Sequence, residues 1–330
     1  MNSTVKKITK SNEFFMFAII LVMFCIFGLI NPAFFSTANL FDLSRSMVET
    51  GILALGCQVV MISGGIDLSF MAIGVFAMHT VSKYMGMYWN DAPFILLALM
   101  GAAIGLVLGL FNSLFIAKFK LPPFIVTLGT TNIFKGLCLV FIGSRQINNI
   151  PASMIEFSKT NLISVEAEQG MANLHIGVLI LAVLAVLTSF MLNKTRLGRS
   201  VYCVGGSEAS AQRIGLNTVA ILAFAYAFLG ALAGFTGVMH ASFQRMSNPF
   251  DMIGGELTVI AAVTIGGPRV GGGHGSTSGT LLGVLLLTMI NNSLVMLKIP
   301  TFWQQAVTGM IIILGTIMQI YRYKRSLKNA

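Results

Sequence analysis

The chain has 330 residues, of which 55% are hydrophobic and only 10% are charged, and its mean hydropathy is +0.84. Soluble domains carry about 25% charged residues, so this composition excludes an ordinary soluble protein and predicts an integral membrane protein. The net charge of +10 comes without a basic patch interleaved with aromatic residues, which argues against nucleic-acid binding. The first apolar run, 14–30, is followed by Asn31-Pro32-Ala33-Phe34-Phe35 rather than by a cleavage site, so we interpret it as a first span.

Apolar segments of membrane-spanning length recur along the whole chain. A hydrocarbon core about 30 Å thick needs roughly 20 apolar residues per helix, and ten segments fit, with nine to eleven as the range. They run approximately over residues 14–30, 46–63, 66–86, 92–117, 122–143, 174–192, 218–241, 252–266, 277–297 and 302–321. The sequence therefore predicts an all-α polytopic membrane protein, with one transmembrane domain over residues 1–330 and with broken helices.

The basic residues predict the orientation of these spans, because cytoplasmic loops carry an excess of Lys and Arg. An even number of spans places both tails, 1–13 and 322–330, on one side. With that side cytoplasmic, a loop at about 194–217 is also cytoplasmic and a loop at about 144–173 is periplasmic. Fourteen of the 21 basic residues then lie inside: Lys6, Lys7, Lys10, Lys118, Lys120, Lys194, Arg196, Arg199, Arg213, Arg269, Arg322, Lys324, Arg325 and Lys328. The opposite orientation would invert this asymmetry.

A short polar stretch in the loop at about 194–217 predicts an isolated helix with both ends specified. Ser207 is a good N-cap residue, Glu208 places negative charge in the first turn, and Arg213 lies in the last turn. Gly215 can take the left-handed conformation that ends many helices. Because a helix of about two turns is marginal alone, we expect a soluble partner to stabilise it, with Ala211 fitting a groove. The alternative is a solvated loop.

A break in the apolar pattern between the second and third spans carries a carboxylate. Gly64 and Gly65 permit positive φ angles and interrupt the helix, and Asp67 or Ser69 can cap the helix that follows. Irregular backbone near the bilayer is tolerated only where protein or a water-filled cavity surrounds it. Asp67 therefore has three possible roles: a cap in a tight cytoplasmic turn, a ligand for solute or proton, or a part of a gate or helix contact.

A second break begins at Gly266 and Gly267 and continues to Ser276. This glycine-rich stretch lacks the order G-x-x-x-x-G-K-[ST] of a phosphate-binding loop. His274 has no Cys, Asp or second His beside it, so a metal site is not predicted there. We expect a compact cytoplasmic loop that joins short helices.

Within the spans, most polar side chains are amides and hydroxyls. Such groups can hydrogen-bond a neutral polyhydroxylated solute, or they can bond one helix to another. The candidate pathway residues are Gln58, Asn112, Thr127, Asn132, Asn291 and Asn292. Two glycine series, Gly101-Gly105-Gly109 and Gly230-Gly234-Gly237, predict close helix contacts.

The sequence predicts no covalent chemistry for this chain. No intramembrane carboxylate pair or His/Asp/Glu relay is apparent, which argues against a proton pump, and no spacing suggests nucleophilic catalysis. None of the four cysteines forms a C-x-x-C pair. We expect small buried thiols, with no disulfide framework, catalytic residue, metal or cofactor.

Three motifs follow one another in a familiar order. They are Ser63-Gly-Gly-Ile-Asp-Leu-Ser69, Gly205-Gly-Ser-Glu-Ala-Ser-Ala-Gln-Arg-Ile-Gly215, and Gly266-Gly-Pro-Arg-Val-Gly-Gly-Gly-His-Gly-Ser276 followed by Gly279-Thr-Leu-Leu-Gly283 and Asn291-Asn292. Over nearly its whole length, the chain resembles the membrane permease subunits of bacterial ribose/xylose-type monosaccharide ABC importers.

The resemblance implies a multi-pass permease of the bacterial inner membrane that conducts a monosaccharide or a related polyol or furanosyl solute. It also implies three partners: a periplasmic sugar-binding protein, a cytoplasmic ATPase, and a second permease copy or a sister permease. The short polar helix would be the coupling helix that docks in a groove of the ATPase. Its residues are Ser207, Glu208, Ala209, Ser210, Ala211, Gln212, Arg213, Ile214 and Gly215.

The main alternative is a stand-alone secondary sugar carrier. Such a carrier needs coupling-ion ligands at broken helices near the midplane, whereas both breaks here are expected near the cytoplasmic face. A membrane-bound enzyme is a third alternative, but the chain shows no acid–base or metal constellation for it.

Overall fold

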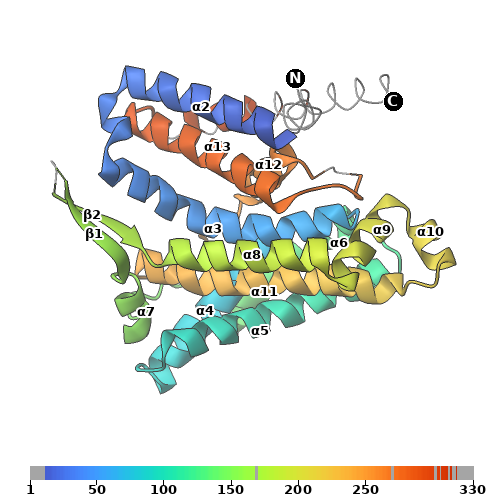
Figure 1. The fold of residues 1–330 in the computed structure, drawn as a ribbon. Coiled ribbons are helices and arrows are strands. Elements are labelled where there is room, and N and C mark those ends of the chain that lie inside the picture. The colour runs from blue at the N-terminus through green and yellow to red at the C-terminus, as the bar shows by residue number, and fades with distance from the viewer. Residues whose placement is uncertain are drawn as a thin grey trace, which may run out of the picture.

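The structure, a computed structural model, describes residues 12–167, 170–268, 271–300, 303, 304, 306–310, 313 and 317. Long helices dominate it (Figure 1). In chain order the elements are α2 (Asn12–Ile30), η1 (Pro32–Phe35), α3 (Thr37–Ile62), α4 (Phe70–Tyr88), α5 (Phe94–Ser113), η2 (Leu114–Lys118), α6 (Pro123–Leu137), η3 (Cys138–Ile142), α7 (Ala152–Phe157), β1 (Asn161–Ala167), β2 (Gly170–His175), α8 (Gly177–Lys194), α9 (Arg196–Gly206), α10 (Glu208–Arg213), α11 (Thr218–Gln244), α12 (Glu256–Gly266) and α13 (Thr277–Met296).

Seven helices in the described part of the chain are long and apolar enough to cross a membrane. They are α2, α3, α5 with η2, α6 with η3, α8, α11 and α13. Of the other predicted spans, the third corresponds to α4, which lies outside this set of seven, and the eighth to α12, which has only 11 residues. The tenth, 302–321, lies largely outside the described residues. The fold is that of a polytopic helical membrane protein.

Two predicted segments differ from the structure. The second span was expected to begin at residue 46, but α3 begins at Thr37, where the Ser36 hydroxyl caps the helix by accepting from the Asn39 amide at 3.2 Å. Charged residues in its first turns, such as Asp42 and Arg45, hide this extension from a hydropathy count. The expected loop at about 144–173 contains α7 and an antiparallel hairpin of β1 and β2, so the all-α prediction missed a small sheet.

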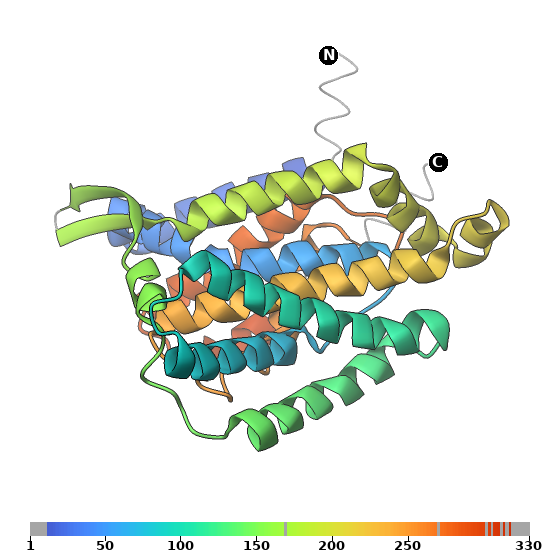
Figure 2. The same ribbon diagram turned by 90° about the horizontal axis from the view of Figure 1, so that it is seen from below.

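The helices run lengthwise between two different ends of the molecule (Figure 1). The α10 end carries α9 and α10, and the hairpin end carries α7, β1 and β2. Helix α11 lies centrally and packs on α5, α4 and α3, while α13 packs on α12, α3 and α2. Seen from below, α6 lies at the edge of the bundle (Figure 2), where its main helical neighbour is α4.

The two glycine series pack directly against each other, as the sequence predicted. A Cβ atom at Gly105 would collide with the carbonyl oxygen of Gly230, and one at Gly234 would collide with that of Gly101. Gly237 contacts the backbone of α4 at Gly74 in the same way. Because no side chain separates them, the backbones of α5 and α11 approach closely along their length.

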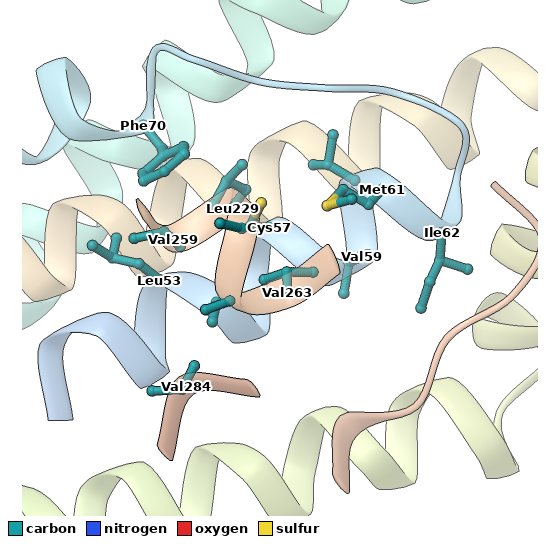
Figure 3. Close-up of a cluster of buried hydrophobic side chains, with 14 of the residues drawn as sticks. Leu53, Cys57, Val59, Met61, Ile62, Phe70, Leu229, Val259, Val263 and Val284 are labelled. Carbon is teal, nitrogen blue, oxygen red and sulfur yellow. The ribbon is translucent and has the colours of Figure 1, made fainter. Parts of the chain in front are cut away.

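The second half of α3 forms the centre of the apolar core. Every residue from Gly51 to Ile62 is buried. Figure 3 shows a part of this core, in which Leu53, Cys57, Val59, Met61, Ile62, Phe70, Leu229, Val259, Val263 and Val284 come together from α3, α4, α11, α12 and α13. The end of α3 is thus fixed from several sides.

Cys57 and Cys138 are buried as expected, but Cys25 and Cys203 are exposed.

Candidate functional site

The three motifs meet at the α10 end, although they are far apart in the sequence. The Gly273 amide donates to the carbonyl oxygen of Ile62, the last residue of α3, at 2.8 Å. A Cβ atom at Gly205 would overlap that same carbonyl, and one at Gly272 would lie 2.6 Å from the Gly205 oxygen and 2.9 Å from the Gly64 Cα. We call this meeting point of Gly64, Gly205, Gly272 and Gly273 the glycine junction. Only residues without side chains allow the three segments to approach so closely.

The predicted break between the second and third spans is present. Helix α3 ends where the Gly64 and Gly65 amides donate back to Met61 and Val60, both at 3.0 Å, and Gly64 has a φ of +93°. The chain then runs without regular structure until α4 begins at Phe70. Gly65, Asp67 and Ser69 in this stretch are buried and Gly64 is exposed. Protein therefore surrounds most of the irregular backbone, which is the condition for such backbone near a bilayer.

Asp67 holds the turn that precedes α4. Its Oδ1 accepts from both the amide and the hydroxyl of Ser69, each at 2.6 Å, and Asp67 is only 1% exposed. The Asn112 amide of α5 donates to the Ser69 hydroxyl at 2.6 Å. Ser69 occupies the N-cap position of α4, but its side chain makes no capping bond. Asp67 therefore stabilises the turn before the helix, through a bond to the backbone two residues on, rather than the first helical turn.

Helix α6 supports the same break from the other side. The Thr127 hydroxyl lies 3.5 Å from the Ile66 carbonyl oxygen, and the Thr131 hydroxyl donates to the Leu68 carbonyl at 3.2 Å. Both hydroxyls also donate within α6, to Pro123 and Thr127 respectively. The Ile66 and Leu68 carbonyl groups lie outside any helix, and the two hydroxyls are their hydrogen-bond partners. These polar contacts connect α6 to the break.

The six candidate pathway residues do not form one line through the molecule. Gln58 bonds α3 to α13, since its Nε2 donates to Thr277 at 3.2 Å and its Oε1 accepts from Thr280 at 2.8 Å. Asn112 and Thr127 are buried at the break. The remaining three are dispersed: Asn132 is exposed on α6, Asn291 accepts from Thr308 at 3.1 Å, and Asn292 is partly buried. Gln58, Asn112 and Thr127 thus make helix contacts here, and a pathway role for the set stays a prediction.

The predicted polar helix is present as α10, with the expected ends. The Ser207 hydroxyl accepts from the Ser210 amide at 3.2 Å, and Gly215 has a φ of +82°. A second helix, α9, precedes it and was not expected. Its Gly198, Val201 and Val204 form a buried face while Arg196 and Arg199 belong to the polar face. The spacing of these apolar residues was the signal for α9.

The exposed face of α10 differs from the expected one. Ala211 is 2% exposed and packs within the chain, so it does not offer its side chain to a partner. This corrects the expectation that Ala211 fits a groove on a second protein. The outward residues are Ala209, Ser210, Gln212, Arg213 and Ile214. Ile214 is 70% exposed, which makes it an apolar anchor on an otherwise polar surface.

Glu208 makes its main contact within the chain. The Lys120 ammonium group, in the turn between η2 and α6, donates to the Glu208 carboxylate, and this bond lowers the pKa of Glu208 below its usual value. Gln212 also donates to Glu208, at 3.3 Å, and to Thr218 at 3.2 Å. The ion pair links α10 to the start of α6, the helix that supports the break. Sequence reasoning did not connect Lys120 with Glu208, because 88 residues separate them.

A polar cluster that no sequence motif indicated lies towards the hairpin end. His240 of α11 places Nδ1 at 2.9 Å from a Glu49 carboxylate oxygen of α3 and Nε2 at 3.9 Å from a carboxylate oxygen of Asp251. The sequence pattern indicated no His/Asp/Glu relay, and the structure nevertheless brings one histidine and two carboxylates together here. The three residues come from two helices and a loop, and no spacing in the sequence brings them together.

Known proteins agree with the class that the helices define, a polytopic membrane protein. Residues 39–315 match a family model described as "Branched-chain amino acid transport system / permease component". The autoinducer 2 import system permease protein LsrC of Yersinia pseudotuberculosis is 31% identical over 89% of this chain and 80% of its own length. The ribose import permease protein RbsC of Bacillus subtilis is 30% identical over 90% of this chain and 89% of its own. No solved structure matches the chain.

The chain therefore belongs to the family of permease components of branched-chain amino acid-type transport systems. It is the permease subunit of an ABC importer and not an enzyme. The alternative of a stand-alone secondary carrier is set aside, since the family supplies one component of a larger system. Membership implies an ATPase and a periplasmic binding protein as partners.

Proposed function

We propose that the chain forms the translocation pathway for a monosaccharide or a related furanosyl solute in an importer of the bacterial inner membrane. The relatives support this substrate class. Their names specify import of autoinducer 2 and of ribose, and each matches about nine-tenths of this chain. A binding protein outside the membrane would deliver the solute. A second permease copy or a sister permease would complete the pathway.

We propose further that α10 is the coupling helix and that its outward face contacts the ATPase. The observation that carries this proposal is the placement of α10 beside the glycine junction, with Ala209, Ser210, Arg213 and Ile214 exposed. A contact made at α10 acts on the break through Glu208, Lys120 and α6. Movement driven by ATP binding would thereby reach the buried turn at Asp67.

The proposed topology has ten spans with both tails in the cytoplasm, which places the α10 end inside. The sequence supports this orientation, because it places 14 of the 21 basic residues inside, among them Lys118 and Lys120 after α5, Lys194 at the end of α8, and Arg196 and Arg199 in α9. An excess of Lys and Arg is the property of cytoplasmic loops. The loop that contains β1 and β2 would then face the periplasm.

Uptake by the complete importer tests the proposed substrate. Cells lacking their own sugar importers would express this chain with its ATPase and binding protein, and the uptake of radiolabelled D-ribose, D-xylose, D-galactose and D-allose would be measured. We expect accumulation of at least one sugar, and its loss when the ATPase is inactivated. Accumulation of leucine but of no sugar would contradict the substrate class, and uptake by the permease alone would contradict the coupled mechanism.

A further inference from the structure

A cavity of about 310 Å³ opens beside the glycine junction, between the elements that the coupling helix connects. The break forms one wall with Ser63, Gly64 and Gly65, while Lys120 and Glu208 line the cavity from the turn before α6 and from α10. Its volume is at the small end of ligand-binding pockets, which span about 300–1,000 Å³.

One wall of the cavity is formed by Tyr226, whose buried hydroxyl has no hydrogen-bond partner among the described residues. Tyr226 of α11 is fully buried, it lines the cavity, and its OH makes no hydrogen bond. Such a group loses its hydration without compensation, which costs free energy unless a partner is supplied. A buried Tyr hydroxyl can donate to a ligand and accept from it.

The other lining groups define the class of ligand. Val204, Leu222 and Pro122 provide apolar surface, while the Lys120 ammonium group provides a donor and the Glu208 carboxylate provides acceptors. One positive and one negative side chain together favour a neutral ligand that carries both donors and acceptors. A sugar ring has an apolar face and hydroxyls around its edge, and a single ring suits the volume, whereas a nucleotide is too large.

We propose that this cavity binds a neutral monosaccharide from the α10 end and that its occupancy slows transport. The effect on transport rests on the proposed function, because the α10 end must face the cytoplasm where imported solute accumulates. A ligand in contact with the break, α10 and the turn before α6 holds these three elements in one arrangement. The bound ligand therefore opposes any movement that separates these three elements. The size of this effect depends on how much more tightly the ligand binds the closed arrangement than the open one. The cavity would make import self-limiting.

Direct binding tests the site without transport. The permease–ATPase complex would be purified without binding protein, placed in nanodiscs, and equilibrated with radiolabelled D-ribose, D-xylose, D-galactose and D-allose. We expect saturable binding of at least one sugar, at one site per permease chain. Tyr226→Phe removes only the unpartnered hydroxyl, so the fold is retained while affinity falls about three- to tenfold, as for the loss of one neutral hydrogen bond. Tyr84→Phe, a partly exposed tyrosine outside the cavity, serves as the matched control and should bind normally.

The regulatory effect is tested in proteoliposomes whose lumen corresponds to the cytoplasm. Preloading the lumen with the bound sugar should slow ATP-driven uptake, and Tyr226→Phe should shift the inhibitory concentration upward by the same factor as the binding constant. Absence of saturable binding for all four sugars, or unchanged affinity in Tyr226→Phe, would overturn the site. Binding without inhibition would overturn the regulation. Binding by a complex that imports no sugar would instead contradict the proposed function and leave the site intact.

Discussion

At the scale of single residues, the break between α3 and α4 depends on one short set of side-chain bonds. Asp67, Ser69 and Asn112 are all fully or almost fully buried, and they bond in series from the break to α5. Buried polar groups of this kind stabilise a structure only while each keeps its partner. The turn is therefore sensitive to the shape and acceptor capacity of the side chain at position 67.

Substitution of Asp67 separates its hydrogen bonds from its charge. Asp67→Asn retains an Oδ1 that can accept from the Ser69 amide, so we expect uptake within about threefold of wild type at matched expression. Asp67→Leu leaves the Ser69 amide and hydroxyl unsatisfied, which costs about 1–3 kcal/mol for each buried group, and uptake should fall more than tenfold, a difference of about 1.4 kcal/mol or more. Equal and complete loss in both variants would show that the charge itself is required.

The Lys120–Glu208 ion pair should affect transport, because it links α10 to α6, and it should contribute little to the stability of the fold. Its side chains are 46% and 38% exposed, so the pair adds about 1 kcal/mol or less. Lys120→Glu and Glu208→Lys should each reduce ATP-driven uptake while leaving the melting temperature of the complex nearly unchanged. The double exchange should restore uptake in part. Additive losses in the double variant would indicate that the two residues act independently.

The same pair predicts how pH affects the contact. The pKa of Glu208 is lowered in the folded chain, so the stabilising contribution is present above the ordinary pKa of a glutamate and is lost as the pH falls through the lowered value. Between about pH 6 and 8 the pair should stay intact. We therefore expect the dependence of uptake on salt concentration to be the same at each pH in that range. Uptake by wild type and by Glu208→Gln, measured at several salt concentrations and pH values, tests this.

At the scale of elements, local sequence accounts for α10 but not for its surroundings. Ser207 and Gly215 specify the two ends of this helix, and both act as expected. The direction of its faces depends on α9 and α11, which pack on one side and bury Ala211. Caps are local signals that a sequence carries directly, whereas the buried face of a two-turn helix is decided by its neighbours.

The glycine contact between α5 and α11 predicts opposite effects for two glycines in helices. A Cβ at Gly105 has no space beside the Gly230 carbonyl, so Gly105→Ala should force the helices apart and destabilise the protein by about 1–3 kcal/mol. Gly129 of α6 has open space around it, so Gly129→Ala is the matched control and should be neutral or stabilising by up to about 1 kcal/mol. Thermal unfolding of the detergent-solubilised chain measures both, and equal melting temperatures would contradict the packing.

At the scale of the whole molecule, hydropathy predicted most of the membrane helices, and the ordered motifs predicted the family. Neither could predict that the motifs lie together. The contacts among Gly64, Gly205 and Gly272 join segments 67 to 208 residues apart, and only the packing of α3, α9 and the glycine-rich loop brings them together. The hairpin of β1 and β2 was missed for a related reason, because a short exposed sheet has no apolar run of membrane length to mark it.

We propose that the exposed face of α10 contacts the ATPase. The most direct test of this proposal is site-specific cross-linking in the complete importer, after replacement of the four native cysteines, one of which, Cys203, is exposed near α10. A cysteine at Ala209 should form a cross-link to the ATPase that changes in yield when ATP binds, whereas a cysteine at Glu166 in β1 should form none and should react with a membrane-impermeant reagent added outside. Cross-linking of the ATPase at Glu166, or outside labelling at Ala209, would contradict the account.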